Sequence, residues 1–326
     1  MKYKLLNFAR QVALMLLVIW TVVSLVTFLI EIVPGDPATV ILGETATQEQ
    51  IDNFRARHGL DRPAFFFSYS GQTGFVWNGV DNRYSEYWLG LLHGDMGTSF
   101  RTEGPVRDMI FERYPTTIKL ALAAMLVAIG IALPLGVLAG SRKNSIADNF
   151  ASFFALLGIS LPTFVIGPFL VYIFAVKLGW FSPTGSYYPE DIVLPAVTLG
   201  AALSAILTRM IRSSVIEELG EDYVRTARAK GVSERMVLFK HVLKNGLIPV
   251  VTILGLQLGV LLAGAIITEK IFNWQGLGLL LLEDGIAKRD YRLVQGCVLV
   301  ISITYILANA LTDFVYRKLD PRIRLS

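Results

Sequence analysis

Long apolar stretches without charged residues, separated by charged segments, dominate this sequence. The first runs from Gln11 to Ile30, and a helix of that length crosses the ~30 Å hydrocarbon core of a bilayer. The composition agrees, because 53% of the residues are hydrophobic, only 17% are charged and the mean hydropathy is +0.54. Soluble domains average about 25% charged residues. The sequence therefore predicts an all-α, polytopic membrane protein with six transmembrane helices.

The expected segments follow from the positions of these stretches. Residues 1–33 hold the N-terminus and the first span, 34–113 form a polar segment, and 114–316 form the transmembrane core. The expected spans of the core are near 114–140, 150–177, 192–211, 246–268 and 293–316. A signal peptide is the alternative for the N-terminus, but its apolar region would be only ~7–15 residues long. The longer run here favours a retained first span.

Lys and Arg are distributed unevenly among the short loops. They occur in the N-terminus, in loop 141–149, in segment 212–245 and in the tail 317–326, whereas loop 179–191 has none. Basic residues favour cytoplasmic loops, and segments longer than ~60 residues translocate largely regardless of charge. Both termini are therefore expected in the cytoplasm, with a long extracytoplasmic loop after the first span.

Two local features are predicted within this framework. Thr47 is expected to cap a short amphipathic helix over 47–59, in which His58 lies on the apolar side. Pro162 and Pro168 interrupt the third span and predict a kink. Aromatic residues also cluster between positions 65 and 88, where packing in a lobe or at the membrane interface is favoured over the alternative of substrate contact.

The charged island between the fourth and fifth spans has a helix–turn–helix pattern. Ala227 favours a first helix, Gly231 is a plausible helix end with a left-handed turn, and Ser233 can cap a second helix from Glu234 to Lys244. Such a hairpin with a basic surface is something that another protein can bind. The alternative is a cytoplasmic loop whose charge only enforces topology.

Signatures of catalysis and of metal or nucleotide binding are missing from the sequence. It has no phosphate-binding loop, no nucleophile elbow and no His-Glu-x-x-His motif, its single Cys297 cannot form an intrachain disulfide, and its three histidines are scattered. No basic face interleaved with aromatic residues suggests nucleic-acid binding. We therefore expect no enzyme activity, no metal site and no cofactor in this chain.

Few ionisable residues lie in or beside the expected spans, and all of them are near span ends: Glu31, Lys119, Lys177, Arg209, Glu269 and Asp313. Ion-coupled transporters rely on ionisable groups inside the helix bundle. Energy coupling from a partner bound at the charged island is therefore favoured. An ATPase-independent transporter and a membrane anchor for an enzyme complex stay open as alternatives.

Short motifs lie along nearly the whole chain. They are Pro34-Gly-Asp-Pro-Ala38, Gly59-Leu-Asp-Arg-Pro63, Gly94-Asp-Met-Gly-Thr-Ser99, Ser160-Leu-Pro-Thr-Phe164, Asp222 to Gly231, His241 to Pro249, Glu269 to Gly278, Arg289-Asp-Tyr291 and Asp320-Pro-Arg-Ile-Arg324. Together they resemble the motifs of permease subunits of bacterial ABC importers of the dipeptide/oligopeptide/nickel type, and of the first permease of the pair. Arg225-Thr226-Ala227 stands where the general importer pattern has Glu-Ala-Ala, as in the peptide branch. Region 70–89 is longer than usual for the family.

The resemblance implies a multi-pass permease of the bacterial inner membrane that forms half of a translocation path for short peptides. An oligosaccharide or a nickel chelate is the alternative solute. The implied partners are a second homologous permease, one or two ATPase subunits that bind ATP and Mg²⁺, and an extracytoplasmic substrate-binding protein. The residues implied in ATPase coupling are Tyr223, Arg225, Ala227, Arg228, Lys230, Gly231 and His241. Those implied on the side of the binding protein are Glu269, Phe272, Trp274, Gly276 and Gly278.

Overall fold

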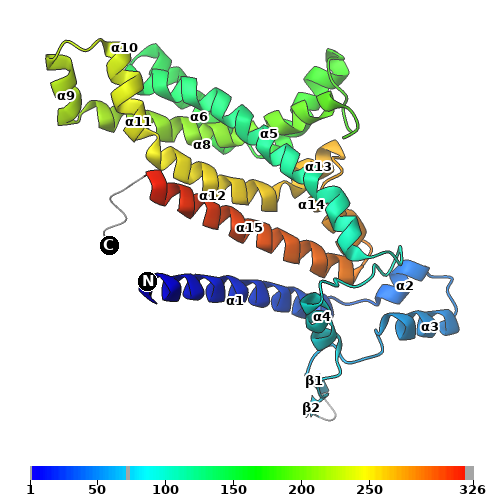
Figure 1. Ribbon diagram of the computed structural model, residues 1–326. Coiled ribbons are helices and arrows are strands. Elements are labelled where there is room, and N and C mark those ends of the chain that lie inside the picture. The colour runs from blue at the N-terminus through cyan, green and yellow to red at the C-terminus, as the bar shows by residue number, and fades with distance from the viewer. Residues whose placement is uncertain (1, 71–73, 320–326) are drawn as a thin grey trace. The chain divides into compact units, whose positions relative to one another are not determined.

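A computed structural model describes residues 2–70 and 74–319 of this predominantly helical chain (Figure 1). The last family motif, which begins at Asp320, and part of the unusually long 70–89 region lie outside the described residues. The chain divides into two compact units, Met1–Pro115 with Gly276–Ile303, and Thr116–Gln275 with Thr304–Ser326. The first, called the N-terminal unit here, contains the polar segment, and the second, the core unit, contains the predicted coupling hairpin.

Helices account for most elements of the N-terminal unit. These are α1 Lys2–Ile32, α2 Pro37–Leu42, α3 Gln48–His58, α4 Arg83–Leu92, the start of α5 Val106–Ser141, α14 Leu277–Leu279, the π-helix η4 Leu280–Ile286 and the start of α15 Tyr291–Leu319. Val23 of α1, Tyr87 of α4 and Leu299 of α15 pack together in a buried cluster. Gln295 donates a hydrogen bond to Thr27 at 2.8 Å, which joins α15 to α1. The polar segment is thereby built onto two apolar helices.

The predicted short helix in the polar segment is confirmed as α3. Thr47 accepts a hydrogen bond from the Gln50 backbone, and the Gln50 side chain accepts one from the Thr47 backbone, which completes a capping box. His58 at the other end packs between two tilted rings, that of Phe54, with centroids 4.4 Å apart, and that of Phe100, with centroids 5.0 Å apart. The apolar side of this helix therefore packs within a lobe formed by the polar segment.

The all-α prediction missed a β-hairpin in the same lobe, formed by β1 Phe67–Ser70 and β2 Gly74–Trp77. The strands pair antiparallel with Phe67 opposite Trp77 and Tyr69 opposite Phe75. Both are aromatic pairs, with ring centroids 4.7 and 5.2 Å apart, and such cross-strand pairs stabilise a two-stranded sheet. Period-two alternation of aromatic residues was the sequence signal that the prediction did not use.

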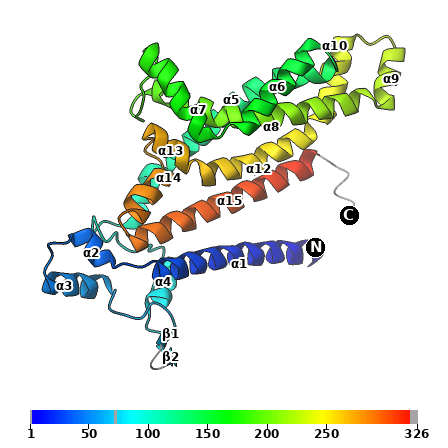
Figure 2. The ribbon, with the colours of Figure 1, turned by 180° about the vertical axis from the view of Figure 1, so that it is seen from behind.

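The core unit is built around close contacts between α5 and α8 Val193–Leu219. A Cβ placed on Gly136 would meet Ile211 at 2.7 Å, and one on Gly140 would meet Val215 at 2.7 Å. The remaining elements of this unit are α6 Ile146–Ser160, α7 Thr163–Leu170, the π-helix η1 Val171–Lys177, the 3₁₀ helix η2 Pro189–Ile192, α9 Asp222–Ala229, α10 Glu234–Met236, the π-helix η3 Val237–Val242, α11 Leu243–Gly246, α12 Ile248–Gly264, α13 Ile266–Phe272 and the part of α15 from Thr304 onward. Figure 2 shows α6, α8 and α12 from behind.

Four helices of the described residues are long and apolar enough to cross a membrane, or up to six if each of two bent pairs is one span. In the first pair, α6 and α7 with η1 meet at 104°, and in the second, Glu234–Gly246 and α12 meet at 49°. Pro162, with an extended backbone, caps α7 at the first bend, so the predicted kink is confirmed there and is sharp. The exact six-span topology stays a prediction.

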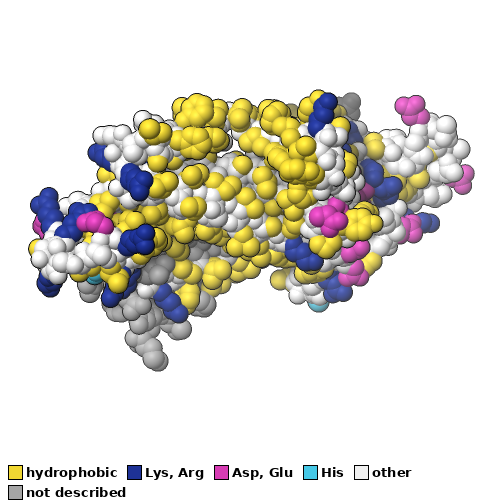
Figure 3. All heavy atoms as spheres, turned by 90° about the horizontal axis from the view of Figure 1, so that it is seen from above, with side chains coloured by type: hydrophobic (Ala, Val, Ile, Leu, Met, Phe, Trp, Pro, Cys, Tyr) yellow, Lys and Arg dark blue, Asp and Glu magenta, His cyan; other side chains and the backbone are white. Residues whose placement is uncertain are grey.

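Large hydrophobic side chains cover much of the described surface. Figure 3 shows many hydrophobic side chains exposed on one face. On α6, Phe150, Phe153 and Leu156 are more than half exposed. An apolar surface of this extent is suited to hydrocarbon rather than to water.

Candidate functional site

The predicted helix–turn–helix is present in the core unit. Helix α9 is followed by Gly231 at a φ of +79°, and a second helical segment runs from Glu234 through η3 to the end of α11 at Gly246. The Val232 backbone donates to the carbonyl of Ala227 at 3.2 Å, which closes the end of α9. Ser233 holds the predicted N-cap position, but its side chain makes no capping hydrogen bond.

Side chains from both arms cross-link this hairpin. Arg228 and Glu234 form a bidentate ion pair, with Nε to Oε1 at 2.8 Å and Nη2 to Oε2 at 3.1 Å. The hydroxyl of Tyr223 donates to the Glu218 carboxylate and lies 3.4 Å from the carbonyl oxygen of His241. Burial, with the Glu218 carboxylate in support, raises the pKa of Tyr223 above its ordinary value, so Tyr223 stays a neutral donor. The turn and both arms are therefore held as one piece.

The hairpin has a buried face and an exposed face. Val224, Ala227 and Val237 are buried and pack in the same cluster as the core of α5 and α8. Of the residues predicted for coupling, Arg225, Arg228, Lys230 and Gly231 are exposed, Tyr223 and His241 are partly buried, and Ala227 is buried. Ala227 thus anchors the hairpin, and the basic side chains form its outer surface.

Two apolar residues on the exposed face were not predicted. Met236 is 50% exposed and Phe239 is 67% exposed. They are three positions apart on one helical segment, a spacing that places side chains on the same face. Neither residue is among those implied in ATPase coupling, because their exposure becomes apparent only in the folded hairpin.

A buried ion pair at the base of the hairpin was also missed. Arg212, near the end of α8, makes two hydrogen bonds to Asp148 in the first turn of α6, of which the Nη2–Oδ2 bond is 2.9 Å. The Asp148 side chain is only 2% exposed and also accepts the backbone N–H of Asn144 at 2.9 Å. The pair joins the helix that leads into the hairpin to the start of the first bent pair.

The segment predicted to face the binding protein is buried. Glu269, Phe272 and Trp274 are at most 4% exposed, and Gly276 and Gly278 are buried as well. Within the core unit, Glu269 accepts a hydrogen bond from Thr117 at 2.7 Å. The Trp274 indole donates to the carbonyl of Thr116 at 3.1 Å.

Glu269, Phe272 and Trp274 are therefore packed inside the core unit. Buried side chains offer little surface to a docked protein in the conformation described, and the place of the five residues on the side of the binding protein stays a prediction. The side of the membrane on which the segment lies stays a prediction.

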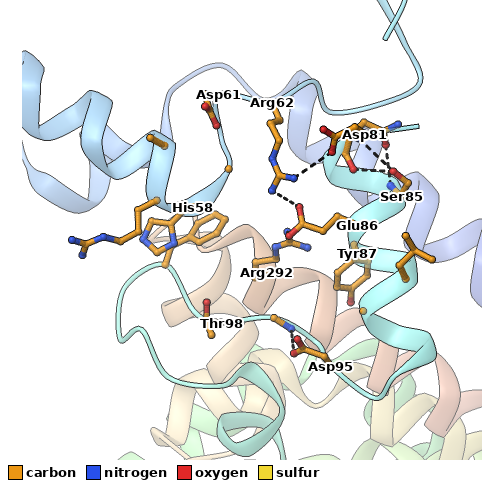
Figure 4. Close-up of a pocket in the computed structure, with 18 of the residues that line it drawn as sticks. His58, Asp61, Arg62, Asp81, Ser85, Glu86, Tyr87, Asp95, Thr98 and Arg292 are labelled. Atoms are coloured by element: carbon orange, nitrogen blue, oxygen red, sulfur yellow. Dashed lines mark hydrogen bonds and ion pairs between the residues drawn. The ribbon is translucent and has the colours of Figure 1, made fainter. Parts of the chain in front are cut away.

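A polar pocket of about 840 Å³ lies in the N-terminal unit, and it had no counterpart among the sequence predictions. Figure 4 shows Arg62, Glu86 and Arg292 converging in it. Glu86 accepts a hydrogen bond from Arg62 at 2.6 Å and lies 3.4 Å from Arg292. No described residues form a group of three or more His, Cys, Asp or Glu side chains that could hold a metal ion.

Similarity to known proteins places the chain among transport proteins of the membrane. Residues 132–325 match the family described as binding-protein-dependent transport system inner membrane component, and residues 5–121 match the family that describes the N-terminal part of the membrane component of such systems. The chain belongs to this family and is a permease subunit of an ABC importer. It is a transport subunit rather than an enzyme, and a multi-pass protein of the inner membrane.

Individual relatives and solved structures resemble the chain over most of its length. It is 38% identical over 321 residues to the glutathione transport system permease protein GsiC of Escherichia coli (strain K12). The aligned region covers 98% of this chain and 99% of that protein. The corresponding protein of Salmonella paratyphi A is 39% identical with the same coverage. Inward-facing structures of the MetNI methionine ABC transporter share the fold, with a TM-score of 0.55 at 20% identity over 65% of this chain and 96% of that one. A structure of an amino acid ABC transporter with histidines gives a TM-score of 0.53 at 16% identity, over 65% of this chain and 94% of that one.

Proposed function

We propose that this permease forms half of a translocation path for short peptides that an extracytoplasmic binding protein delivers. The observation that carries the proposal is the match, over 98% of the chain, to permeases named for the transport of glutathione, which is itself a tripeptide. An oligosaccharide or a nickel chelate is the competing solute.

Uptake measurements on the reconstituted importer test this proposal. Proteoliposomes containing the importer, its binding protein and ATP should accumulate a labelled tripeptide, and unlabelled peptides should compete for uptake. Competition by disaccharides or nickel chelates, without competition by peptides, would assign a different solute.

The proposed topology has six spans, with α6, α7 and η1 counted as one and the fifth span near 246–268, and both termini lie in the cytoplasm. The expected segments are those of the sequence, namely 1–33, 34–113, 114–316 and 317–326, with the coupling hairpin inside 212–245. The uneven distribution of Lys and Arg supports this orientation. The partners are a second homologous permease, one or two ATPase subunits and a binding protein, and ATP with Mg²⁺ is bound by the ATPases rather than by this chain.

The coupling hairpin is proposed to dock on an ATPase subunit. Its exposed side combines the basic residues Arg225 and Lys230 with the apolar residues Met236 and Phe239. A rim of charge around exposed apolar side chains is the composition expected of a protein–protein contact. Tyr223, Ala227, Arg228, Gly231 and His241 hold the hairpin in shape rather than contacting the partner themselves.

Motion of the hairpin is proposed to reach the spans through the base of α8. The Asp148–Arg212 pair and the close approach of Gly140 to Val215 join α5, α6 and α8 at this end. Packed helices move as units rather than deforming continuously. Rotation of the hairpin by an ATPase should therefore move these three helices together.

A further inference from the structure

The pocket in the N-terminal unit has no role in the coupling described so far, although it concentrates charged side chains (Figure 4). Arg62 and Arg292 approach the same carboxylate, that of Glu86, at 2.6 and 3.4 Å. Arg62 also lies 3.5 Å from Asp81, whose side chain is 88% exposed. Water screens so exposed a charge strongly, so Glu86 is the main counter-ion in direct contact with both guanidinium groups, in a pocket that Asp61 and Asp95 also line.

Arg292 is the less exposed of the two arginines, with a side chain only 13% exposed. The ring of Tyr87 lies beneath its guanidinium group, 5.7 Å from ring centroid to Cζ. Its only other charged or hydrogen-bonding contact with the described residues is the one with Glu86. A guanidinium group has five N–H donors, so most of its capacity for hydrogen bonds is unused.

Two glycines leave room for the arginine side chains. A Cβ on Gly97 would lie 3.3 Å from Cδ of Arg292, and one on Gly59 would lie 2.6 Å from Nη2 of Arg62. Both glycines have a positive φ, of +81° and +64°. Contacts with Glu86 hold the two guanidinium groups next to each other before any ligand arrives, which lowers the entropic cost of binding.

We propose that this pocket binds the C-terminal carboxylate of a short peptide between Arg292 and Arg62. Paired guanidinium groups with one shared counter-ion favour a second carboxylate, which they can bind through two parallel hydrogen bonds. The inference rests on the proposed function, because it takes its ligand class from peptide transport.

The opposite side of the pocket suits the amino end of the peptide. Asp61 lies across the pocket from Tyr87, and it makes no hydrogen bond or ion pair with another described residue (Figure 4). Its carboxylate is thus available to an ammonium group. A volume of about 840 Å³ is within the range of small-molecule sites, about 300–1,000 Å³. A di- or tripeptide in this pocket would be bound to the permease itself rather than to the binding protein.

Direct binding to the full-length chain in lipid nanodiscs tests the proposal. Trialanine should bind, and its C-terminal amide should bind about tenfold more weakly or worse, because the amide lacks the charge that pairs with Arg292. Arg292→Gln should weaken trialanine binding by a similar factor. The matched control is Arg107→Gln, because Arg107 lies in the same unit, outside the pocket, with a 59% exposed side chain.

Glu86→Gln keeps the proposal testable if Arg292→Gln fails to fold. Removal of the competing carboxylate should tighten trialanine binding, a change that damage to the fold does not produce. Asp61→Asn should weaken trialanine binding but leave binding of N-acetyl-trialanine unchanged. Equal binding of trialanine and its amide, or no effect of Arg292→Gln and Glu86→Gln on binding, would overturn the inference.

Uptake of trialanine by the reconstituted importer separates this inference from the proposed function. Peptide uptake without Arg292-dependent binding would refute the role of the pocket in peptide binding, and the proposed function in peptide transport would stand. Arg292-dependent binding without peptide uptake would leave a carboxylate site and refute peptide transport.

Discussion

Arg228 on α9 and Glu234 on α10 form a bidentate ion pair around the turn at Gly231, through contacts of 2.8 and 3.1 Å. The two residues are brought together by the positive φ of Gly231, +79°, which reverses the chain between the two arms. The shape of the coupling hairpin therefore depends on one backbone conformation that glycine adopts without strain.

Gly231→Val is expected to reduce or uncouple transport. A Cβ at position 231 has no atom within 4 Å, so the damage comes from the positive φ alone, at about 1–3 kcal/mol for a β-branched residue. Gly231→Asn is the matched control, because asparagine tolerates this conformation. Solute uptake and ATPase activity of the reconstituted complex are the measurements. If uptake and ATPase activity of Gly231→Val equal those of the wild type, the turn has no role in coupling. The alternative, a loop whose charge only enforces topology, would then be favoured.

Asp148→Asn is expected to lower the free energy of unfolding by about 3 kcal/mol, because Arg212 then loses its partner in a largely buried site. Asp222→Asn is the control, since Asp222 is 96% exposed and lies 3.5 Å from Arg225. The control should have no measurable effect. Reversible unfolding of the purified protein in detergent is the measurement, and equal stabilities of the two variants would contradict a structural role for the buried pair.

Gly140→Ala is expected to destabilise the contact between α5 and α8 by about 1–3 kcal/mol. The added Cβ would lie 2.7 Å from Val215 and 2.9 Å from the Arg212 carbonyl oxygen, so the helix backbones must separate. Gly130→Ala, on the same helix, meets nothing within 4 Å and should be neutral or slightly stabilising. Thermal unfolding of both variants tests the close packing, and a neutral Gly140→Ala would show that the helices do not approach this closely.

The lobe around α3 is expected to lose stability as the pH falls. Burial between Phe54 and Phe100 lowers the pKa of His58 below its ordinary value of 6.5, with the nearby positive charge of Arg57 acting in the same direction and Glu103 and Asp290 opposing. The unfolded state therefore binds a proton more readily than the folded state. The stability that neutral His58 provides is present above about pH 6.5 and declines as the pH falls towards the lower folded-state pKa.

His58→Phe should remove this pH dependence while keeping the aromatic contacts. Hydrogen exchange of residues 48–58 at about pH 7.5 and about pH 5.5 is the measurement, with the exchange rates corrected for their own pH dependence. Equal loss of protection at low pH in the variant and in the wild type would assign the effect to another group.

Thiol labelling in cells tests the orientation. Cys297 is fully buried, so the wild-type background with a membrane-impermeant reagent should be low. Val80→Cys, at a position that is 73% exposed, should label in cells with an intact inner membrane. Ser233→Cys, which is exposed in the coupling hairpin, should label only after the membrane is permeabilised. The reverse pattern would invert the proposed topology.

The sequence alone determined the features that depend on local chemistry. Uncharged stretches fix a helical membrane protein, since hydrocarbon offers no partner for backbone groups. The Thr47 cap, the left-handed turn at Gly231 and the bend at Pro162 each depend on neighbouring residues and on the conformations that a residue type allows. Local rules of this kind can be read without knowing which distant segments meet.

Only the tertiary structure decided which distant residues meet and which side chains are buried. Asp148 and Arg212 are 64 positions apart, and no local pattern pairs them. Glu269 is fully buried and accepts a hydrogen bond from Thr117, 152 positions away, which its local sequence does not indicate. The convergence of Arg62 and Arg292 on Glu86 likewise depends on how α4 packs beside the start of α15. Packing selects these contacts from many that are chemically equivalent, because it depends on shape throughout the unit rather than on sequence spacing.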